Sequence, residues 1–170
     1  AVCMALLLGS RPLGAQVVIS EFMAINDNAL MDEDGDTTDW IEIHNAAPTT
    51  VDLGGWYLTD RSNDLIRWSF PSTNLLAGEF LVVFASGKGR RVSGRELHTD
   101  FKLDGDGEYL ALVKPDGVTV AAEFAPAFPK QYADISYGLQ TTNTSVMLIN
   151  TGAPGRAFVP TDSSLGLTWT

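Results

Sequence analysis

The chain has 170 residues, of which 45% are hydrophobic and 19% charged; this composition is typical of one globular domain with flanking segments and excludes a disordered chain. Its 21 acidic and 11 basic residues give a formal net charge of −10 at pH 7, which argues against nucleic acid or an anionic membrane as a partner. The single cysteine, Cys3, leaves no internal disulfide, so packing must stabilise the fold.

Residues 1–15 have the pattern of a signal-peptide remnant. Ala1–Leu8 is an apolar run, and the small residues Gly14 and Ala15 precede Gln16 as in a processing site, so we expect cleavage after Ala15. The run is shorter than the roughly 20 apolar residues of a membrane-spanning helix. We therefore predict a secreted or cell-surface protein without a membrane span, with a first core strand or a membrane anchor as the alternatives.

Seven short apolar segments follow in chain order, and most are bounded by Gly, Pro, Asn or Asp, as β-strands are. In the second, Ile41, Ile43 and Asn45 fall on one face, as expected for a half-buried strand. The fifth is apolar throughout, which predicts a central strand covered on both faces. The predicted strands are Val17–Met23, Asp39–Asn45, Val51–Leu58, Leu65–Phe70, Phe80–Ala85, Glu108–Val113 and Val118–Phe124.

The turns and tryptophans indicate how these strands pack. Gly54 and Gly55 precede Trp56 and permit a bend that turns the indole inward. Trp56 and Trp68 are therefore predicted core residues, with a ligand-stacking platform as the alternative. The Asp-Gly pair in Lys114–Gly117 predicts a hairpin turn. Two sheets packed face to face are the simplest architecture for this pattern.

The domain boundaries follow from the same pattern. We expect one β-sandwich domain over residues 16–138, then a closing segment and linker over residues 139–156, where Val146–Ile149 is a candidate last edge strand. Residues 157–170 regain apolar character and are interpreted as the truncated start of a following segment.

The charges are unevenly distributed along the chain. Between Asn26 and Asp64 ten carboxylates accompany one base, Arg61, whereas the stretch from Lys88 to Lys102 is basic. We therefore expect one acidic end and one basic loop in the folded domain. Binding of a polyanion is one hypothesis for the loop sequence KGRRVSGR, and a solvated surface is the favoured one.

The order of the motifs resembles that of the lamin tail domain family, in particular its bacterial secreted members. The resemblance covers roughly residues 18–138, and it implies an all-β, immunoglobulin-like antiparallel β-sandwich without a catalytic centre that contacts other macromolecules through its surface. The motifs that carry it are ISEFMA (Ile19–Ala24), DWIEIHN (Asp39–Asn45), VDLGGWYLTD (Val51–Asp60), RWSFP (Arg67–Pro71), FLVVFASGK (Phe80–Lys88), LHTDFKL (Leu97–Leu103), GEYLALVKPDG (Gly107–Gly117) and ISYG (Ile135–Gly138).

An acidic turn carries the one candidate metal site. Asp32, Asp34, Asp36 and Asp39 surround Gly35, and carboxylates at such spacing suit calcium. The positions do not match an EF-hand loop, and an acidic turn exposed to solvent is the alternative. The segment Asp104–Glu108 could likewise bind calcium or form an acidic turn exposed to solvent, and a hairpin turn is the favoured interpretation there. No cofactor other than this calcium is predicted.

The remaining polar residues give no catalytic set. His98 and Asp100 are two positions apart in a presumed extended segment and could point the same way, as a charge-paired dyad or half a metal site. His44 is expected to be an ordinary exposed or hydrogen-bonded histidine. Ser86 lacks the glycine pattern of a serine elbow, so we predict no catalytic residue and no enzyme activity.

Three hypotheses about function follow. The first is a secreted or cell-surface interaction module that binds a protein or an extracellular polymer as part of a larger protein. The second is a targeting module of a secreted hydrolase or nuclease whose catalytic domain lies elsewhere. The third is a calcium-dependent adhesion or carbohydrate-binding domain.

Overall fold

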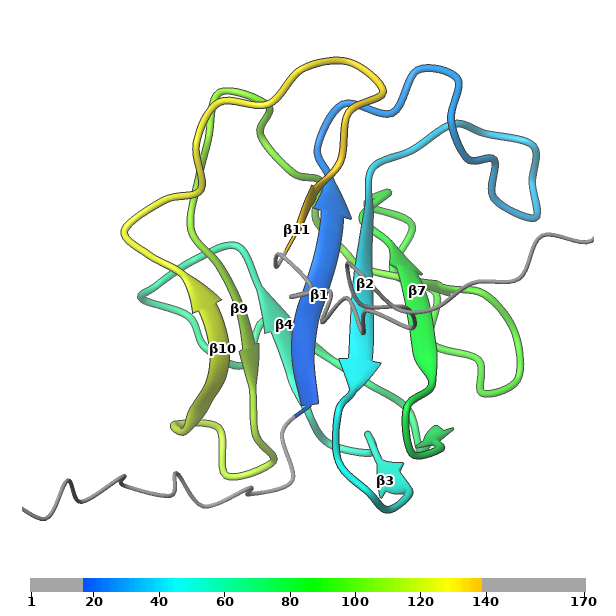
Figure 1. Ribbon diagram of the computed structural model, residues 1–170, viewed down its shortest axis with the longest axis vertical. Helices are drawn as coiled ribbons and strands as arrows, with labels where there is room; N and C mark the ends of the chain where they lie inside the picture. The colour runs from blue at the N-terminus through cyan, green and yellow to red at the C-terminus, as the bar shows by residue number, and fades with distance from the viewer. Residues whose placement is uncertain (1–16, 139–170) are drawn as a thin grey trace, which may run out of the picture. The chain divides into compact units, whose positions relative to one another are not determined.

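The computed structural model describes residues 17–138, which form an all-β fold with two main sheets facing each other (Figure 1). The predicted fold class is confirmed. No membrane-spanning helix is found among these residues. The predictions for residues 1–15, 139–156 and 157–170 concern segments outside the described part of the chain.

The first sheet has the strand order β11-β1-β2-β7-β8, and its strands pair antiparallel except β7 and β8, which are parallel. The second sheet has the order β10-β9-β4-β5, and β3 pairs with β6 in a small ribbon. The strands are β1 (Val17–Met23), β2 (Trp40–Asn45), β3 (Val51–Asp52), β4 (Tyr57–Thr59), β5 (Trp68–Ser69), β6 (Asn74–Leu75), β7 (Phe80–Phe84), β8 (Leu97–His98), β9 (Leu110–Val113), β10 (Val120–Phe124) and β11 (Tyr137–Gly138).

The core lies between the two sheets and is filled by aromatic and branched side chains. Trp68 is 0% exposed and meets Phe70 edge to face, with ring centroids 4.9 Å apart. Trp56 is also buried, so both tryptophans are core residues as predicted. Ile41 and Ile43 are buried on the predicted face of β2. Asn45 is buried beside them and donates from Nδ2 to the Thr49 carbonyl at 2.8 Å, which satisfies its amide.

Two expectations about turns are confirmed. The predicted strand Val51–Leu58 is broken at the glycine pair into β3 and β4, and Gly55 has φ of 78°, which a residue without Cβ adopts at little cost. Lys114–Gly117 connects β9 to β10 as a hairpin, in which the Lys114 N–H donates to the Thr119 carbonyl at 2.8 Å.

Other expectations are wrong. Phe80 of β7 is 54% exposed, because alternation turns Leu81 and Val83 toward the core and Phe80 outward, against the His44 ring. The strands buried along their whole length are β9 and the two-residue strand β8. Asp104–Glu108 forms a turn but no hairpin, since β8 and β9 belong to different sheets. The two-residue strands β6, β8 and β11 were not predicted, because each is too short to show alternation.

Candidate functional site

The acidic turn and the basic loop lie side by side at one end of the first sheet. The acidic turn (residues 31–37) belongs to the connection from β1 to β2, and the basic loop (residues 88–95) belongs to the connection from β7 to β8. Strands β2 and β7 are antiparallel neighbours, and Trp40 at the start of β2 pairs with Phe84 at the end of β7. The two loops therefore lie at the same end of the sheet and contact each other.

The Lys88 ammonium occupies the centre of the acidic turn. Its Nζ lies 2.5 Å from Asp32 Oδ2, 2.8 Å from Asp34 Oδ2 and 2.9 Å from Asp36 Oδ2. The Asp32 side chain is 0% exposed. Burial alone would raise the pKa of Asp32, but hydrogen bonds from Lys88 and from the backbone N–H groups of Asp36 and Asp34 outweigh burial and hold that pKa below its usual value. Hydrogen bonds from Lys88 and Arg90 lower the pKa of Asp34 to about 2.

Two arginines complete this ion cluster. Arg95 donates to Glu33 Oε2 from Nη2 at 2.7 Å and from Nε at 3.1 Å. Arg90 donates from Nη2 to Asp34 Oδ2 at 2.8 Å, and its Nη1 donates to Glu33. The fold brings the expected acidic end and basic loop together, so that their charges largely neutralise each other.

The four predicted calcium ligands are divided between two places. Asp32, Asp34 and Asp36 each offer an oxygen within 4.8 Å of the others. Asp39 lies apart from them: its Oδ2 accepts a hydrogen bond from the Leu103 N–H at 3.2 Å, and burial raises the pKa of its carboxyl to about 6. Calcium binding stays a prediction, and Lys88 is the group with which the ion would compete.

His98 lies beneath the ion cluster and is 0% exposed. Its Nδ1 is 2.9 Å from Ser86 Oγ and 3.9 Å from Asp32 Oδ2, and its ring stacks on Phe84. Burial, followed by the nearby Arg90 charge, lowers the pKa of the imidazole. The predicted dyad with Asp100 is wrong, because Asp100 is exposed and its Oδ1 lies 3.6 Å from Arg67 Nε.

The grouping of Ser86, His98 and Asp32 has the residue types of a hydrolytic triad but not its geometry. In a triad the hydroxyl contacts Nε2 and the carboxylate contacts Nδ1, so that the imidazole takes the hydroxyl proton while the carboxylate orients the ring and stabilises its charged form. Here both approach Nδ1, and Nε2 is buried without a hydrogen-bond partner. The arrangement orients a neutral imidazole and cannot activate the Ser86 hydroxyl through Nε2.

Sequence analysis missed the roles of three residues. Lys88 was assigned to a solvated loop, Ser86 was considered only as a nucleophile, and Glu108 was assigned to the turn Asp104–Glu108 and to the start of the strand Glu108–Val113. Burial raises the pKa of Glu108 to about 7, with the neighbouring Asp60 and Asp104 carboxylates adding to the effect and a hydrogen bond from the Asp104 N–H opposing it. A usable signal was present for Lys88, since this residue begins a basic segment whose charge is opposite to that of the acidic turn.

The fold and this charged end define residues 17–138 as an immunoglobulin-like β-sandwich held at one end by an internal ion cluster. The family model described as Lamin Tail Domain matches residues 11–125 of the chain. The chain belongs to the lamin tail domain family, as its motifs indicated, and this family consists of non-catalytic, immunoglobulin-like protein-interaction domains. A search of curated proteins gave no match to the chain.

Proposed function

We propose that this chain is a secreted or cell-surface module that binds a protein or extracellular polymer as part of a larger protein. The observation that carries the proposal is membership in a family of protein-interaction domains, with a match that covers most of the sandwich. The apolar run Ala1–Leu8 followed by small residues supports export.

The ion cluster supports a binding role by holding loops in place. The ion pairs of Lys88, Arg90 and Arg95 hold the two loops together before any partner binds. Without these ion pairs, each loop would lose conformational entropy at the moment of binding. A surface ordered before binding pays less entropy on association. Rigid loops on a β-sandwich are a common arrangement for recognition.

Export is tested first, with the full-length gene expressed in its own host. We expect the protein in the medium or on the cell surface, with Gln16 as its first residue by mass spectrometry of the mature N-terminus. Retention of residues 1–15 in a protein confined to the cytoplasm would contradict the proposal.

Binding is tested with the full chain carrying an affinity tag and a photoreactive cross-linker. We expect saturable cross-linking to one or a few extracellular proteins or polymers, abolished by excess untagged chain. The control competitor is the same chain denatured by heat, which has lost the folded surface and should not compete. Cross-linking that does not saturate, or that the denatured chain competes equally well, would contradict a specific interaction module.

A further inference from the structure

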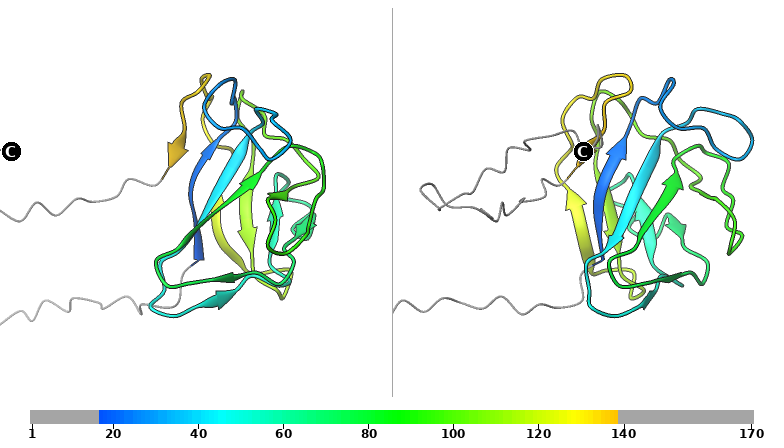
Figure 2. Two further views of the ribbon diagram at one scale, coloured as in Figure 1. Left: turned by 90° about the vertical axis from the view of Figure 1, so that its right-hand side faces the viewer. Right: turned by 45° about the vertical axis from the view of Figure 1, so that its right-hand side comes forward.

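Three loops meet at one end of the sandwich and are joined by hydrogen bonds. We call residues 25–30, 104–108 and 128–136 the loop end; Figures 1 and 2 show these segments next to one another beyond the end of β1. The Gln131 N–H donates to the Gly105 carbonyl at 2.7 Å, and the Asp134 N–H donates to the Ile25 carbonyl at 2.9 Å. The backbone N–H groups of Asp27 and Asn28 each donate to Asp134 Oδ1 at 2.8 Å. These bonds hold the three loops as one ordered surface.

Large apolar side chains are exposed on this surface. Tyr132 is 64% exposed, Ile135 61% and Leu30 38%. Tyr132 and Ile135 are presented by one tight turn, in which the Ile135 N–H donates to the Tyr132 carbonyl at 3.2 Å. Exposed apolar side chains gathered on an ordered surface are a mark of an interaction site, whereas scattered ones are not.

The loop end also carries acidic charge that the fold leaves without a counter-charge. Its three segments contain five carboxylates and one base, Lys130, and that base is engaged by Asp106 at 2.6 Å. Within residues 17–138, no cationic side chain lies within ion-pair distance of Asp27, Asp104 or Asp134. The acidic turn differs, since Lys88 and the two arginines neutralise it.

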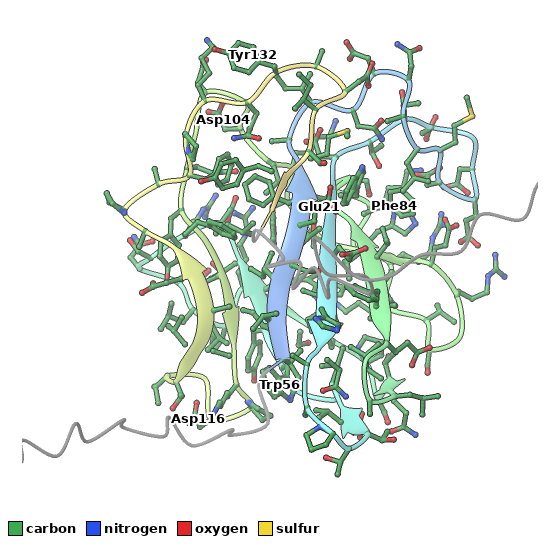
Figure 3. The ribbon with its side chains drawn as sticks, viewed as in Figure 1. Glu21, Trp56, Phe84, Asp104, Asp116 and Tyr132 are labelled. Carbon is green, nitrogen blue, oxygen red and sulfur yellow. The ribbon has the colours of Figure 1, made fainter. Side chains whose placement is uncertain are left out.

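Figure 3 places Tyr132 and Asp104 at this end of the domain, and Asp116 of the β9–β10 hairpin at the opposite end. Apolar and acidic groups are therefore presented together, and the hairpin end offers a comparison surface on the same molecule. Val118 on that hairpin is 73% exposed and serves as a matched apolar control.

We propose that the loop end is the partner-binding surface of this module, and that its partner is a protein segment carrying basic and apolar side chains. Burial of Tyr132, Ile135 and Leu30 supplies affinity, and the uncompensated carboxylates select and steer a cationic segment. The inference rests on the proposed interaction function and adds the surface and the chemistry of the partner.

The test uses the full chain labelled with ¹⁵N and three synthetic peptides. The first alternates Lys with Phe and Ser, the second has Glu in place of each Lys, and the third has Ser in place of each Phe. We expect the first peptide to shift the amide signals of residues 25–30, 104–108 and 128–136 and to bind more weakly as salt is raised. The other two should bind at least about tenfold more weakly.

Three variants locate the contact. We expect Ile135→Ser to weaken binding of the first peptide about tenfold and Asp27→Lys about fivefold, while Val118→Ser stays within about twofold of the wild type. The Asp27 carboxylate makes no hydrogen bond or ion pair to another described side chain, so its reversal should leave the fold intact. Unchanged amide dispersion and melting temperature of each variant verify this.

Each contrary outcome has a defined meaning. Amide signals that shift around His44 and Phe80 instead would contradict the assignment of the loop end as the binding surface. Equal weakening of peptide binding by Val118→Ser and Ile135→Ser would contradict it too. In both cases the module would still be a binding domain. Binding of the Glu peptide as tight as that of the Lys peptide would overturn the chemistry of the partner. No saturable binding of any peptide up to about 1 mM would overturn the inference, and the cross-linking experiment would decide separately whether the chain binds a partner.

Discussion

Replacing Lys88 by methionine tests whether the ion cluster stabilises the domain. The change keeps an unbranched side chain of similar length but removes the ammonium that lies 2.5 to 2.9 Å from three carboxylates. Asp32, whose side chain is 0% exposed, would then be a buried carboxylate without its ion-pair partner. We expect the variant to fold but to be less stable.

The size of the loss follows from the exposure of the two partners. Removing one partner of a fully buried ion pair costs about 3–5 kcal/mol, and an exposed pair contributes about 0–1 kcal/mol. Lys88 is 24% exposed and Asp32 is fully buried. We therefore expect the free energy of unfolding to fall by about 2 kcal/mol, which corresponds to about 8 °C in Tm for a domain of this size.

The assay is thermal and urea unfolding followed by circular dichroism, with Lys130→Met as the matched control. Lys130 also lies 2.6 Å from a carboxylate, that of Asp106, but both side chains are mostly exposed. Its loss should therefore change Tm by less than about 2 °C. A Lys88→Met variant that melts as close to the wild type as Lys130→Met does would refute a stabilising role for the cluster.

A second substitution separates the effect of the unpaired Asp32 charge from the effect of losing the aliphatic chain of Lys88. In the double variant with Asp32→Asn, the amide oxygen can still accept the hydrogen bonds from Asp34 and Asp36, but the buried negative charge is gone. We expect the double variant to recover about half of the lost stability, because the unpaired charge is the main cost. No recovery would mean that Lys88 contributes through packing of its aliphatic chain.

Three further predictions concern metal, pH and packing. Calcium should raise the Tm of Lys88→Met more than that of the wild type, because the ammonium no longer competes; equal melting of both proteins with calcium and with chelator would count against a calcium site at these acids. The pKa of Glu108 is raised above its value in the unfolded chain, so its contribution to stability is complete below about pH 4.5 and is lost as pH rises through about 7. Urea titrations from pH 4.5 to 8 should show Glu108→Gln gaining stability relative to the wild type as pH rises, and a pH-independent difference would contradict this. Trp68→Ala should cost about 3–5 kcal/mol in the same assay, because it empties the centre of the core; a loss below about 1 kcal/mol would show that the indole is dispensable.

The sequence located the core strands well because their signal is local. Alternation in Asp39–Asn45 identified the buried face of β2, and the Asp-Gly pair identified the β9–β10 hairpin. The same reasoning failed for Phe80, because an apolar run does not reveal which of its two faces the second sheet covers. Strand β8 was missed since two residues show no period, although its backbone pairs with β7.

The candidate site was only partly predictable. The spacing of Asp32, Asp34 and Asp36 correctly placed three carboxylates together, because they share one tight turn. Asp39 was grouped with them wrongly, since it begins the approach to β2 and its side chain turns toward Leu103. His98 and Asp100 were expected to face the same way, but β8 ends at His98 and the chain bends at Asp100.

The amino-acid sequence by itself determined the fold class, the hairpin, the tryptophan core and the family, because apolar alternation and turn residues act over a few positions. Only the tertiary structure decided that Lys88 lies among the acidic residues, 56 positions from Asp32, and that the loops around Tyr132 form one surface. Those contacts depend on the antiparallel pairing of β2 with β7 and on hydrogen bonds between distant loops. Pairings of this kind are set by the packing of the whole domain, so no short stretch of sequence specifies them.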